Sequence, residues 1–151
     1  MTWNVYLAGE IHSEWRAEIA RAVASDGLPV ELLAPVTDHA TSDECGARIL
    51  DPAPEGFWRD HQSAKINAIR TRRHIRDADV CVVRFGEKYR QWNAAFDAGL
   101  AVASDKPLIT LHDTDLDHAL KEVDAAALAV ARTPRQVASI LRYVITGRAE
   151  T

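Results

Sequence analysis

Short apolar runs alternate with amphipathic stretches along most of the chain. Apolar runs of roughly four to eight residues, bounded by turn-forming residues, are typical of strands buried on both faces of a parallel sheet. Stretches with apolar residues every three or four positions predict helices that cover those faces. The predicted strands are Trp3–Ala8, Pro29–Leu33, Val80–Arg84, Pro107–Leu111 and, more weakly, Leu128–Ala131.

The predicted helices lie between and after these strands. Ser13 is expected to cap a helix from Glu14 to about Ser25, because a serine hydroxyl can accept a hydrogen bond from a free backbone N–H of the first turn. Thr133 and Pro134 predict the start of the last helix in the same way, as cap and first helical residue. The other predicted helices are Ser63–Arg76, Asn93–Ser104 with Asn93 as its cap, and Asp115–Val123.

The segment from Pro35 to about Gln62 shows no clear periodicity and is predicted to be irregular. It contains Pro52, Pro54 and Gly56, which interrupt regular elements. Long loops inside a compact domain are usually lids, binding loops or oligomer contacts. This segment is therefore interpreted as a lid, a binding loop or an oligomer contact, and its Phe57 and Trp58 would suit a contact between copies of the chain.

Strands that alternate with helices indicate a doubly wound parallel sheet with helices on both faces. We predict a single α/β domain over residues 1–151, flavodoxin-like or Rossmann-like, with five strands in the order 2-1-3-4-5. In this order the sheet changes direction between its first and third strands, and ligands bind at such a switch point. The loops 9–13 and 85–93 are therefore expected to line one crevice.

Composition and charge restrict the classes of partner. A net charge of −4 gives no general attraction to nucleic acid. No apolar stretch approaches membrane-spanning length and the first residues do not resemble a signal peptide, so a cytoplasmic protein without a membrane partner is expected. Cys45, expected in a polar loop, and Cys81, expected in the core, suggest neither a disulfide framework nor a metal site.

Asp97 is the first candidate for chemistry. It interrupts an otherwise uncharged run, and it is predicted to lie in the first turn of the helix that follows the third strand. Its small neighbours Ala94, Ala98 and Gly99 are expected to leave space above the helix for a ligand. A desolvated carboxylate there could attack an electrophilic carbon or orient a sugar hydroxyl. Alternatively, Asp97 is an acid favoured by the positive end of the helix dipole.

The loop after the first strand is the second candidate. Gly9 permits a sharp turn and the close approach of a ligand. The N–H groups at the start of the following helix, near Ser13, can bind a phosphate or carboxylate. Glu10 and His12 are titratable and lie at the predicted crevice, although an ordinary strand-to-helix turn would also explain the glycine.

The predicted helix Ser63–Arg76 carries a further group of polar residues. Asn67, Arg70 and Thr71 share one side and could face the crevice, whereas most of the basic residues of this helix are expected to form a solvated face. Asp60 and His61, just before the predicted helix, are interpreted either as capping residues or as a pair that reaches the site.

The loop from Gly86 to Trp92 is rich in aromatic and hydrogen-bond donor groups. Such a loop is suited to stacking a base and binding a phosphate through Arg90. Alternatively, it is a surface loop with a buried tryptophan.

Several of these segments together resemble the YtoQ family of small bacterial proteins. They are residues 5–16, Asn67 with Arg70-Thr71, residues 85–98 and Lys106-Pro-Leu-Ile109. A more distant resemblance connects Tyr-Leu-Ala-Gly (6–9) and Ala-Phe-Asp-Ala-Gly-Leu-Ala (95–101) to the nucleoside 2-deoxyribosyltransferase superfamily. That superfamily includes nucleoside-monophosphate N-glycosidases and has a flavodoxin-like or Rossmann-like fold.

The distant resemblance places Asp97 on the superfamily's nucleophilic glutamate and Gly99 on the glycine that follows it. It implies retaining chemistry, in which the carboxylate attacks the anomeric carbon and a glycosyl-enzyme intermediate is resolved by water or a second base. In this reading Tyr6 positions the carboxylate and Glu10 or His12 protonates the leaving base. The expected substrate-binding residues are Gly9, Ser13, Asn67, Arg70, Gly86, Arg90, Trp92 and Asn93, with the Gly9 loop, Arg90 and Arg70 holding a phosphate.

The sequence therefore predicts an N-glycosidase or glycosyltransferase acting on a nucleoside or nucleotide. No metal or redox cofactor is implied, and superfamily members commonly form homo-oligomers. Asp97 is one methylene shorter than the glutamate it replaces, and about 1 Å can matter greatly for a nucleophile. The alternative is a non-catalytic protein that binds or senses a nucleotide or nucleotide sugar in the same crevice.

Overall fold

Five parallel strands form one sheet in the computed structural model, which describes residues 1–88 and 91–149. The strands are β1 (Trp3–Gly9), β2 (Val30–Leu33), β3 (Val80–Arg84), β4 (Leu108–Leu111) and β5 (Ala129–Ala131). Their order is β2-β1-β3-β4-β5, and each neighbouring pair is parallel. The predicted Rossmann-like order is confirmed, and β1 and β3 flank the point where the strand order reverses.

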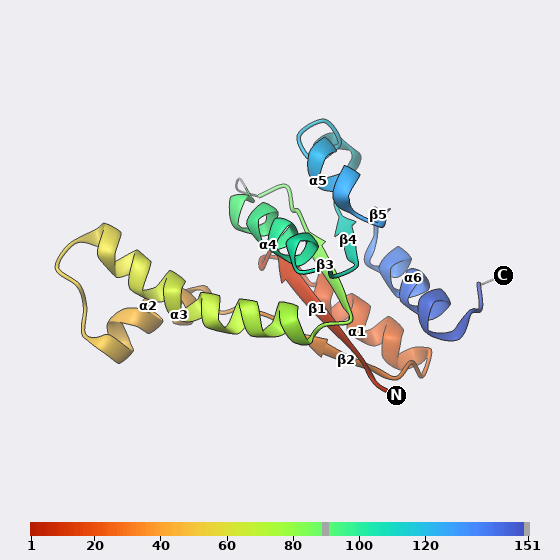
Figure 1. The fold of residues 1–151 in the computed structure, drawn as a ribbon, viewed down its shortest axis with the longest axis horizontal. Coiled ribbons are helices and arrows are strands. Elements are labelled where there is room, and N and C mark those ends of the chain that lie inside the picture. The colour runs from red at the N-terminus through yellow and green to blue at the C-terminus, as the bar shows by residue number, and fades with distance from the viewer. Residues whose placement is uncertain (89–90, 150–151) are drawn as a thin grey trace.

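Helices cover both faces of this sheet (Figure 1). They are α1 (Trp15–Ser25), α2 (His39–Leu50), α3 (Gly56–Asp77), α4 (Trp92–Ala103), α5 (Lys121–Ala126) and α6 (Pro134–Thr146), with a short 3-10 turn, η1, at Thr114–Leu116. On one face, α1 and α6 bury Trp15, Ile19 and Leu141 against the sheet. The core of the other face includes Ile75 from α3 and the alanines of α4.

The segment 35–62 is not irregular, so that prediction was wrong. Asp38 caps α2 by accepting a hydrogen bond from the Thr41 N–H at 2.8 Å, and α3 begins at Gly56 rather than Ser63. α2 packs along α3, and the two helices extend beyond the sheet as a hairpin (Figure 1). Gly46 permits this packing, because a Cβ at this position would lie 2.5 Å from the backbone nitrogen of Ser63.

The start of α1 also differs from the prediction. The helix begins at Trp15, and Ser13 does not cap it. Instead, the Ser13 hydroxyl donates a hydrogen bond to the Glu10 carboxylate at 2.6 Å. This hydrogen bond is stronger than one between the Ser13 hydroxyl and a neutral backbone group would be, because hydrogen bonds to charged groups are the stronger ones.

The start of α4 is one residue earlier than predicted. The helix begins at Trp92 after Gln91, so Asn93 lies inside it and is not its cap. Asp97 is consequently in the second turn, where the helix dipole no longer explains a carboxylate. Ala94, Ala98 and Ala101 are buried against the sheet, and neither Ala94, Ala98 nor Gly99 lines the cavity that Asp97 faces.

Two predictions about the C-terminal half differ in outcome. The helix predicted at Asp115–Val123 is divided into the η1 turn and the later α5. The start of α6 is as predicted, because the Thr133 hydroxyl accepts a hydrogen bond from the Gln136 N–H and Pro134 is the first helical residue.

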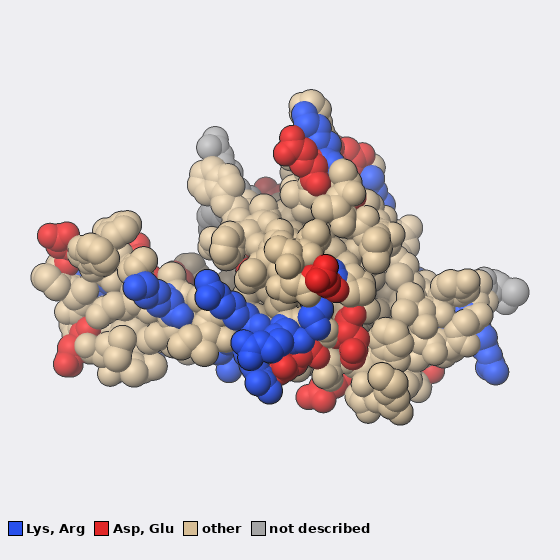
Figure 2. Space-filling view, viewed as in Figure 1, with Lys and Arg blue, Asp and Glu red and all other residues tan. Residues whose placement is uncertain are grey.

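Lysine and arginine side chains gather over α3 in the space-filling view (Figure 2). The exposed basic residues of this helix are Arg59, Lys65, Arg70, Arg72, Arg73 and Arg76, and those within the predicted span confirm the predicted solvated face. Cys81 is buried in β3 as predicted, whereas Cys45 lies in α2 and not in a loop. Within residues 1–88 and 91–149, no helix is both long and apolar enough to cross a membrane.

Candidate active site

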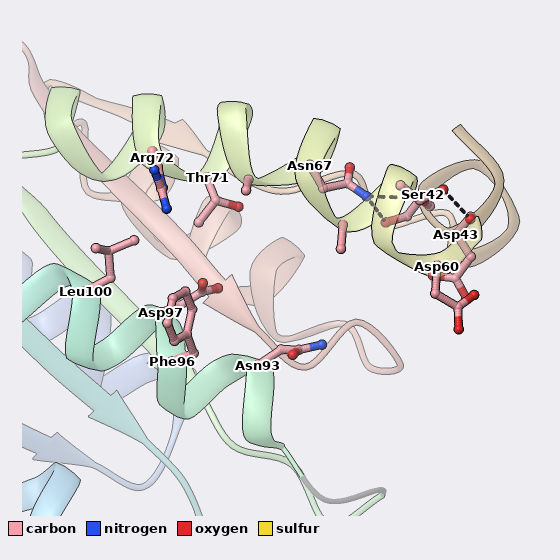
Figure 3. A pocket seen from close by; sticks show the side chains of 13 residues that line it. Ser42, Asp43, Asp60, Asn67, Thr71, Arg72, Asn93, Phe96, Asp97 and Leu100 are labelled. Atoms are coloured by element: carbon pink, nitrogen blue, oxygen red, sulfur yellow. Dashed lines mark hydrogen bonds between the residues drawn. The ribbon is translucent and has the colours of Figure 1, made fainter. Parts of the chain in front are cut away.

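A cavity of about 580 Å³ separates α4 from the α2–α3 hairpin (Figure 3). Its volume lies within the range of small-molecule sites. α4 contributes Asn93, Phe96, Asp97 and Leu100, whereas α2 and α3 contribute most of the polar groups. These are Ser42, Asp43, Asp60, Ser63, Asn67, Thr71 and Arg72.

Asp97 extends from α4 into this cavity toward α3 (Figure 3). Burial raises the pKa of its carboxyl from 3.8 to about 6, and no group among the described residues offsets this effect. A carboxylate that is mostly withdrawn from water and has no hydrogen-bond donor among the described residues is less stable as an anion, and it gains more from attack on an electron-poor carbon. The environment of Asp97 therefore suits a nucleophile or a proton acceptor.

Tyr6 lies in β1 close to Asp97. Burial, followed by the neighbouring Asp97 charge, raises the pKa of the Tyr6 phenol to about 12, and the Thr71 side chain lowers it in part. Its ring stacks on His74 with 5.5 Å between centroids. The Thr71 side chain lies close enough to the buried Tyr6 hydroxyl to lower its pKa, but the two groups do not reach the geometry of a regular hydrogen bond, and no other described residue does. The phenol is therefore neutral and available to donate a hydrogen bond.

The rim of the cavity can hold the rest of a small molecule. The Asn67 amide donates to the backbone oxygen and the hydroxyl of Ser42, at 2.9 and 3.1 Å, which connects α3 to α2 (Figure 3). Phe96 is 67% exposed and lines the cavity, where it offers an aromatic face for a planar base. Asp43 and Asp60 add negative charge, and Arg72 adds positive charge.

Glu10 belongs to a different arrangement, at the carboxyl ends of β1 and β3. Its side chain is buried and accepts hydrogen bonds from the His12 N–H and the Ser13 hydroxyl, with Arg84 Nε at 3.3 Å. Burial alone would raise the pKa of Glu10, but the hydrogen bonds from Ser13, His12 and Arg84 outweigh it and lower that pKa. Glu10 is therefore ionised at neutral pH.

Two glycines and a second arginine complete the loop around Glu10. Gly9 has φ of 100°, and a Cβ there would lie 2.1 Å from the backbone oxygen of Arg84. Its lack of a side chain thus serves the pairing of two strands rather than a ligand. A Cβ at Gly86 would lie 2.5 Å from Glu10 Cγ, so Gly86 makes room for Glu10. The Arg16 guanidinium donates to the backbone oxygens of Leu7, Gly9 and Glu10.

A group with metal-ligating side chains follows β4 and comprises His112, Asp117 and Asp124. Asp124 lies 2.9 Å from His112 Nε2, whereas Asp117 lies on the Nδ1 side at 3.8 Å and also binds Arg132. One cation cannot face both ring nitrogens, so the geometry of this group is that of an ion-paired network.

A comparison with known protein families gives a match over most of the chain. The family model described as nucleoside 2-deoxyribosyltransferase YtoQ matches residues 6–145. The chain belongs to this family. The YtoQ protein of Bacillus subtilis (strain 168) is 40% identical over 144 residues, which cover 95% of this chain and 97% of that protein. At the level of the family, the YtoQ chain is placed among nucleoside-related enzymes.

Solved structures resemble this YtoQ chain in fold. A 2-deoxyribosyltransferase from Bacillus psychrosaccharolyticus, described as a biocatalyst for the synthesis of nucleosides, has a TM-score of 0.53 at 16% identity and covers 89% of this chain and 90% of its own. A conserved protein from Enterococcus faecalis V583 has a TM-score of 0.63 at 13% identity, covering 95% and 99%. At these identities the comparison shows a shared fold.

The residues predicted for the site fall into two groups in the structure. Asp97, Asn93 and Asn67 line the cavity, and Tyr6 lies beside Asp97. Gly9, Glu10, Ser13 and Gly86 belong to the loop network, with His12 exposed on the same loop. Arg70 and Trp92 are exposed and are not among the residues that line the cavity, and Arg90 lies outside the described residues.

The sequence analysis missed the contribution of α2 to the cavity. Ser42 and Asp43 were not considered because α2 was not predicted, although the capping pattern of Asp38 and Thr41 was a usable signal. Asp60 lies within α3 at the cavity and His61 stacks on Phe57, so neither residue caps the helix. Phe96 could have been noted as an apolar residue next to the candidate nucleophile.

Proposed function

We propose that this protein cleaves the N-glycosidic bond of a nucleoside or nucleotide, with Asp97 as the nucleophile. An Asp97 oxygen attacks the anomeric carbon while the bond from that carbon to the base nitrogen breaks. The electron pair of that bond goes to the base, which takes a proton from an acid. Water, or a second base, then displaces Asp97 from the sugar and frees the carboxylate.

The observation that carries this proposal is the desolvated Asp97 carboxylate in a cavity of about 580 Å³. A structural carboxylate is normally hydrogen-bonded when buried, as Glu10 is in this protein. Perturbed carboxylates inside cavities are frequent at catalytic sites. Membership of the YtoQ family supports a nucleoside-related reaction at the level of the family.

The other roles follow from the surroundings of Asp97. Tyr6, neutral and beside Asp97, positions the carboxylate, and its hydroxyl is available to donate a hydrogen bond once substrate is bound. Phe96 supports the base and Asn67 binds the sugar from α3. We assign protonation of the base to His12, which is exposed at the carboxyl ends of the strands, because Glu10 is held as an anion and has no proton to give at neutral pH.

The test is incubation with nucleosides and nucleoside 5′-monophosphates, followed by chromatography for free base. We expect Asp97→Asn to lower the rate of base release by about 10³-fold or more, because the covalent step is lost. Asp115→Asn is the matched control: it removes an exposed carboxylate that does not line the cavity and should keep the rate within about tenfold. An Asp97→Asn variant with wild-type activity would overturn the assignment of the nucleophile.

The same incubation distinguishes an enzyme from a sensor. If neither class of compound releases base but one of them raises the melting temperature of wild-type protein, the protein binds the ligand without turning it over. Asp97→Asn would then affect binding alone, since a sensor has no turnover to lose.

We also propose that the protein forms a homo-oligomer through the α2–α3 hairpin. The hairpin extends from the sheet (Figure 1) and exposes large apolar side chains. These are Ile49, Leu50, Phe57, Trp58 and Ile69, each at least half exposed. Exposed apolar patches of this kind are typical of protein interfaces. Light scattering should give the mass of a dimer or a larger assembly, and Phe57→Glu should lower it; a monomeric wild type would contradict the proposal.

A further inference from the structure

The switch point between β1 and β3 is where a doubly wound fold ordinarily binds an anionic ligand group. Here the loop after β1 leads into α1, and the loop after β3 passes beside it at Gly86. Backbone N–H groups before such a first helix are well placed to bind phosphate. A phosphorylated substrate would therefore place its phosphate at this loop.

In this protein a carboxylate of the chain itself occupies that position. Glu10 is 5% exposed, and it receives a backbone N–H from His12, a hydroxyl from Ser13 and the Nε of Arg84. A backbone amide, a hydroxyl and a guanidinium are the donors that phosphate sites use. All three are directed at Glu10.

The two arginines beneath the loop, Arg84 and Arg16, also bind partners within the chain. Arg84 pairs with Glu10 at 3.3 Å. Arg16 uses its Nε and both terminal nitrogens to donate to the backbone oxygens of Leu7, Gly9 and Glu10. Arg16 cannot turn to an external anion without leaving buried acceptors unpaired, which is costly, and Arg84 cannot withdraw its Nε without leaving Glu10 without its ion pair.

The position of Glu10 is fixed by packing as well as by charge. Gly86 forms the wall next to Glu10, and any side chain there would collide with it. The Trp15 indole N–H donates to the backbone oxygen of Glu10 at 2.8 Å, which fixes the residue from α1. Glu10 is therefore part of a rigid socket, and it excludes a second anion by like-charge repulsion.

We infer that Glu10 is a specificity-determining residue that excludes phosphate from this loop, so that the substrate is an unphosphorylated nucleoside rather than a nucleotide. This assignment rests on the proposed glycosidase function. It replaces the expectation that the Gly9 loop holds a phosphate, because the donors of that loop are used by Glu10.

The first experiment compares kcat/KM for matched nucleosides and nucleoside 5′-monophosphates. We expect wild-type protein to favour nucleosides by about 100-fold or more, because like charges brought together in a buried site are strongly unfavourable. Glu10→Gln keeps the size of the side chain and removes its charge, and it should reduce this preference at least about tenfold. Asp26→Asn is the control: it breaks the ion pair with Arg142, which joins α6 to the end of α1, and should leave the preference unchanged.

The second experiment tests the loop without any turnover. Melting temperatures are measured in inorganic phosphate and in sodium chloride of equal ionic strength. Phosphate is excluded from protein surfaces and stabilises proteins in general, so wild type and Asp26→Asn should show the same small rise in phosphate, whereas the rise should be larger for Glu10→Gln. An equally large rise for wild type would overturn the inference.

The two experiments separate the inference from the function on which it rests. Equal or faster base release from monophosphates than from nucleosides would overturn the substrate assignment and leave the glycosidase proposal standing. Release of base from neither class would overturn the glycosidase proposal together with the substrate assignment. In that case the phosphate melting experiment still decides whether Glu10 blocks an anion site.

Discussion

Glu10 and Asp97 are two carboxylates that follow neighbouring parallel strands, and their environments are opposite. Glu10 is surrounded by hydrogen-bond donors and a guanidinium, which lower its pKa. Asp97 is buried without such donors within the described chain, and its pKa is raised to about 6. Environments that separate the pKa values of two acids commonly separate their roles. Here one carboxylate stabilises a loop, and the other is left available for chemistry.

The same contrast extends to the residues around each acid. Gly9, Gly86, Ser13 and Arg16 are placed so that the polar groups around the Glu10 loop are paired. Next to Asp97, the hydroxyl of Tyr6 is buried without a partner among the described residues. Unpaired polar groups cost stability, and such costs concentrate at functional sites. The comparison indicates that the cavity beside Asp97, where polar groups are left without partners, is the candidate for binding substrate, and that the Glu10 loop, whose polar groups are paired, is not.

The largest change in stability is expected for Glu10→Ala. It leaves Arg84 without its partner and the Ser13 hydroxyl and His12 N–H without their acceptor, so the free energy of unfolding should fall by about 3–5 kcal/mol at pH 7. The pKa of Glu10 is lower in the folded protein than in the unfolded chain. The stabilisation by ionised Glu10 is therefore fully present at pH values above the ordinary pKa of glutamate, and it is lost as the pH falls through the lower pKa of the folded state. Urea denaturation at several pH values measures it.

The control for Glu10→Ala is Glu14→Ala on the same loop. Glu14 is exposed and makes no capping hydrogen bond, so its replacement should change the free energy of unfolding by no more than about 0.5 kcal/mol. If both variants lost the same small amount, the hydrogen bonds to Glu10 would not be what stabilises the loop.

The second prediction concerns Asp97→Asn and has the opposite sign. The folded pKa of Asp97 is raised from 3.8 to about 6, so its ionisation opposes folding. The stabilisation given by the protonated form is complete below about pH 4 and is lost as pH rises through about 6. Asp97→Asn should therefore be more stable than wild type by about 2–3 kcal/mol at pH 8.

The stability difference between Asp97→Asn and wild type should disappear near pH 4, where both side chains are neutral. Urea denaturation at pH 4, 6 and 8 tests this dependence. A variant less stable than wild type at pH 8 would show that Asp97 has a stabilising partner and would contradict its description as desolvated.

The third and smallest effect on stability is expected from replacing one glycine in each region: Gly86 in the Glu10 loop, and Gly99 on α4, the helix that carries Asp97. Gly86→Ala adds a Cβ 2.5 Å from Glu10 Cγ and should cost about 1–3 kcal/mol. Gly99→Ala, on α4, meets nothing within 4 Å and should be neutral or stabilising by up to about 1 kcal/mol. Thermal unfolding of both variants checks the difference. When Glu10→Ala is also present, Gly86→Ala should lower the free energy of unfolding by less, because the Glu10 side chain that collides with the added Cβ is gone.

Much of the fold could be predicted because its signals are local. The apolar runs of the strands and the stripe of Trp15, Ile19 and Val23 show in the sequence which faces are buried. The alternation of strands and helices restricts the topology to few arrangements, and the predicted strand order is the observed one. Asp97 could be identified as a candidate because a charged residue in an apolar helix is unusual.

The α2–α3 hairpin could not be predicted in the same way. α2 is polar along most of its length, and its place depends on the contact of Gly46 with Ser63 of α3. A contact between residues distant in sequence leaves no periodic pattern, and proline at positions 52 and 54 resembled the mark of an irregular segment. The polar wall of the cavity opposite Asp97 was missed for this reason.

The sequence by itself determined the order of the strands and the placement of Glu10 and Asp97 after β1 and β3, because both follow from local hydrophobic patterns. Only the tertiary structure decided that Glu10 turns inward to Arg84 while Asp97 faces a cavity without a hydrogen-bonding partner among the described residues. The pKa of a carboxylate depends on the donors, charges and water that surround it in space. Those neighbours come from β3, α3 and α2, and the packing of these elements gave the two acids different environments.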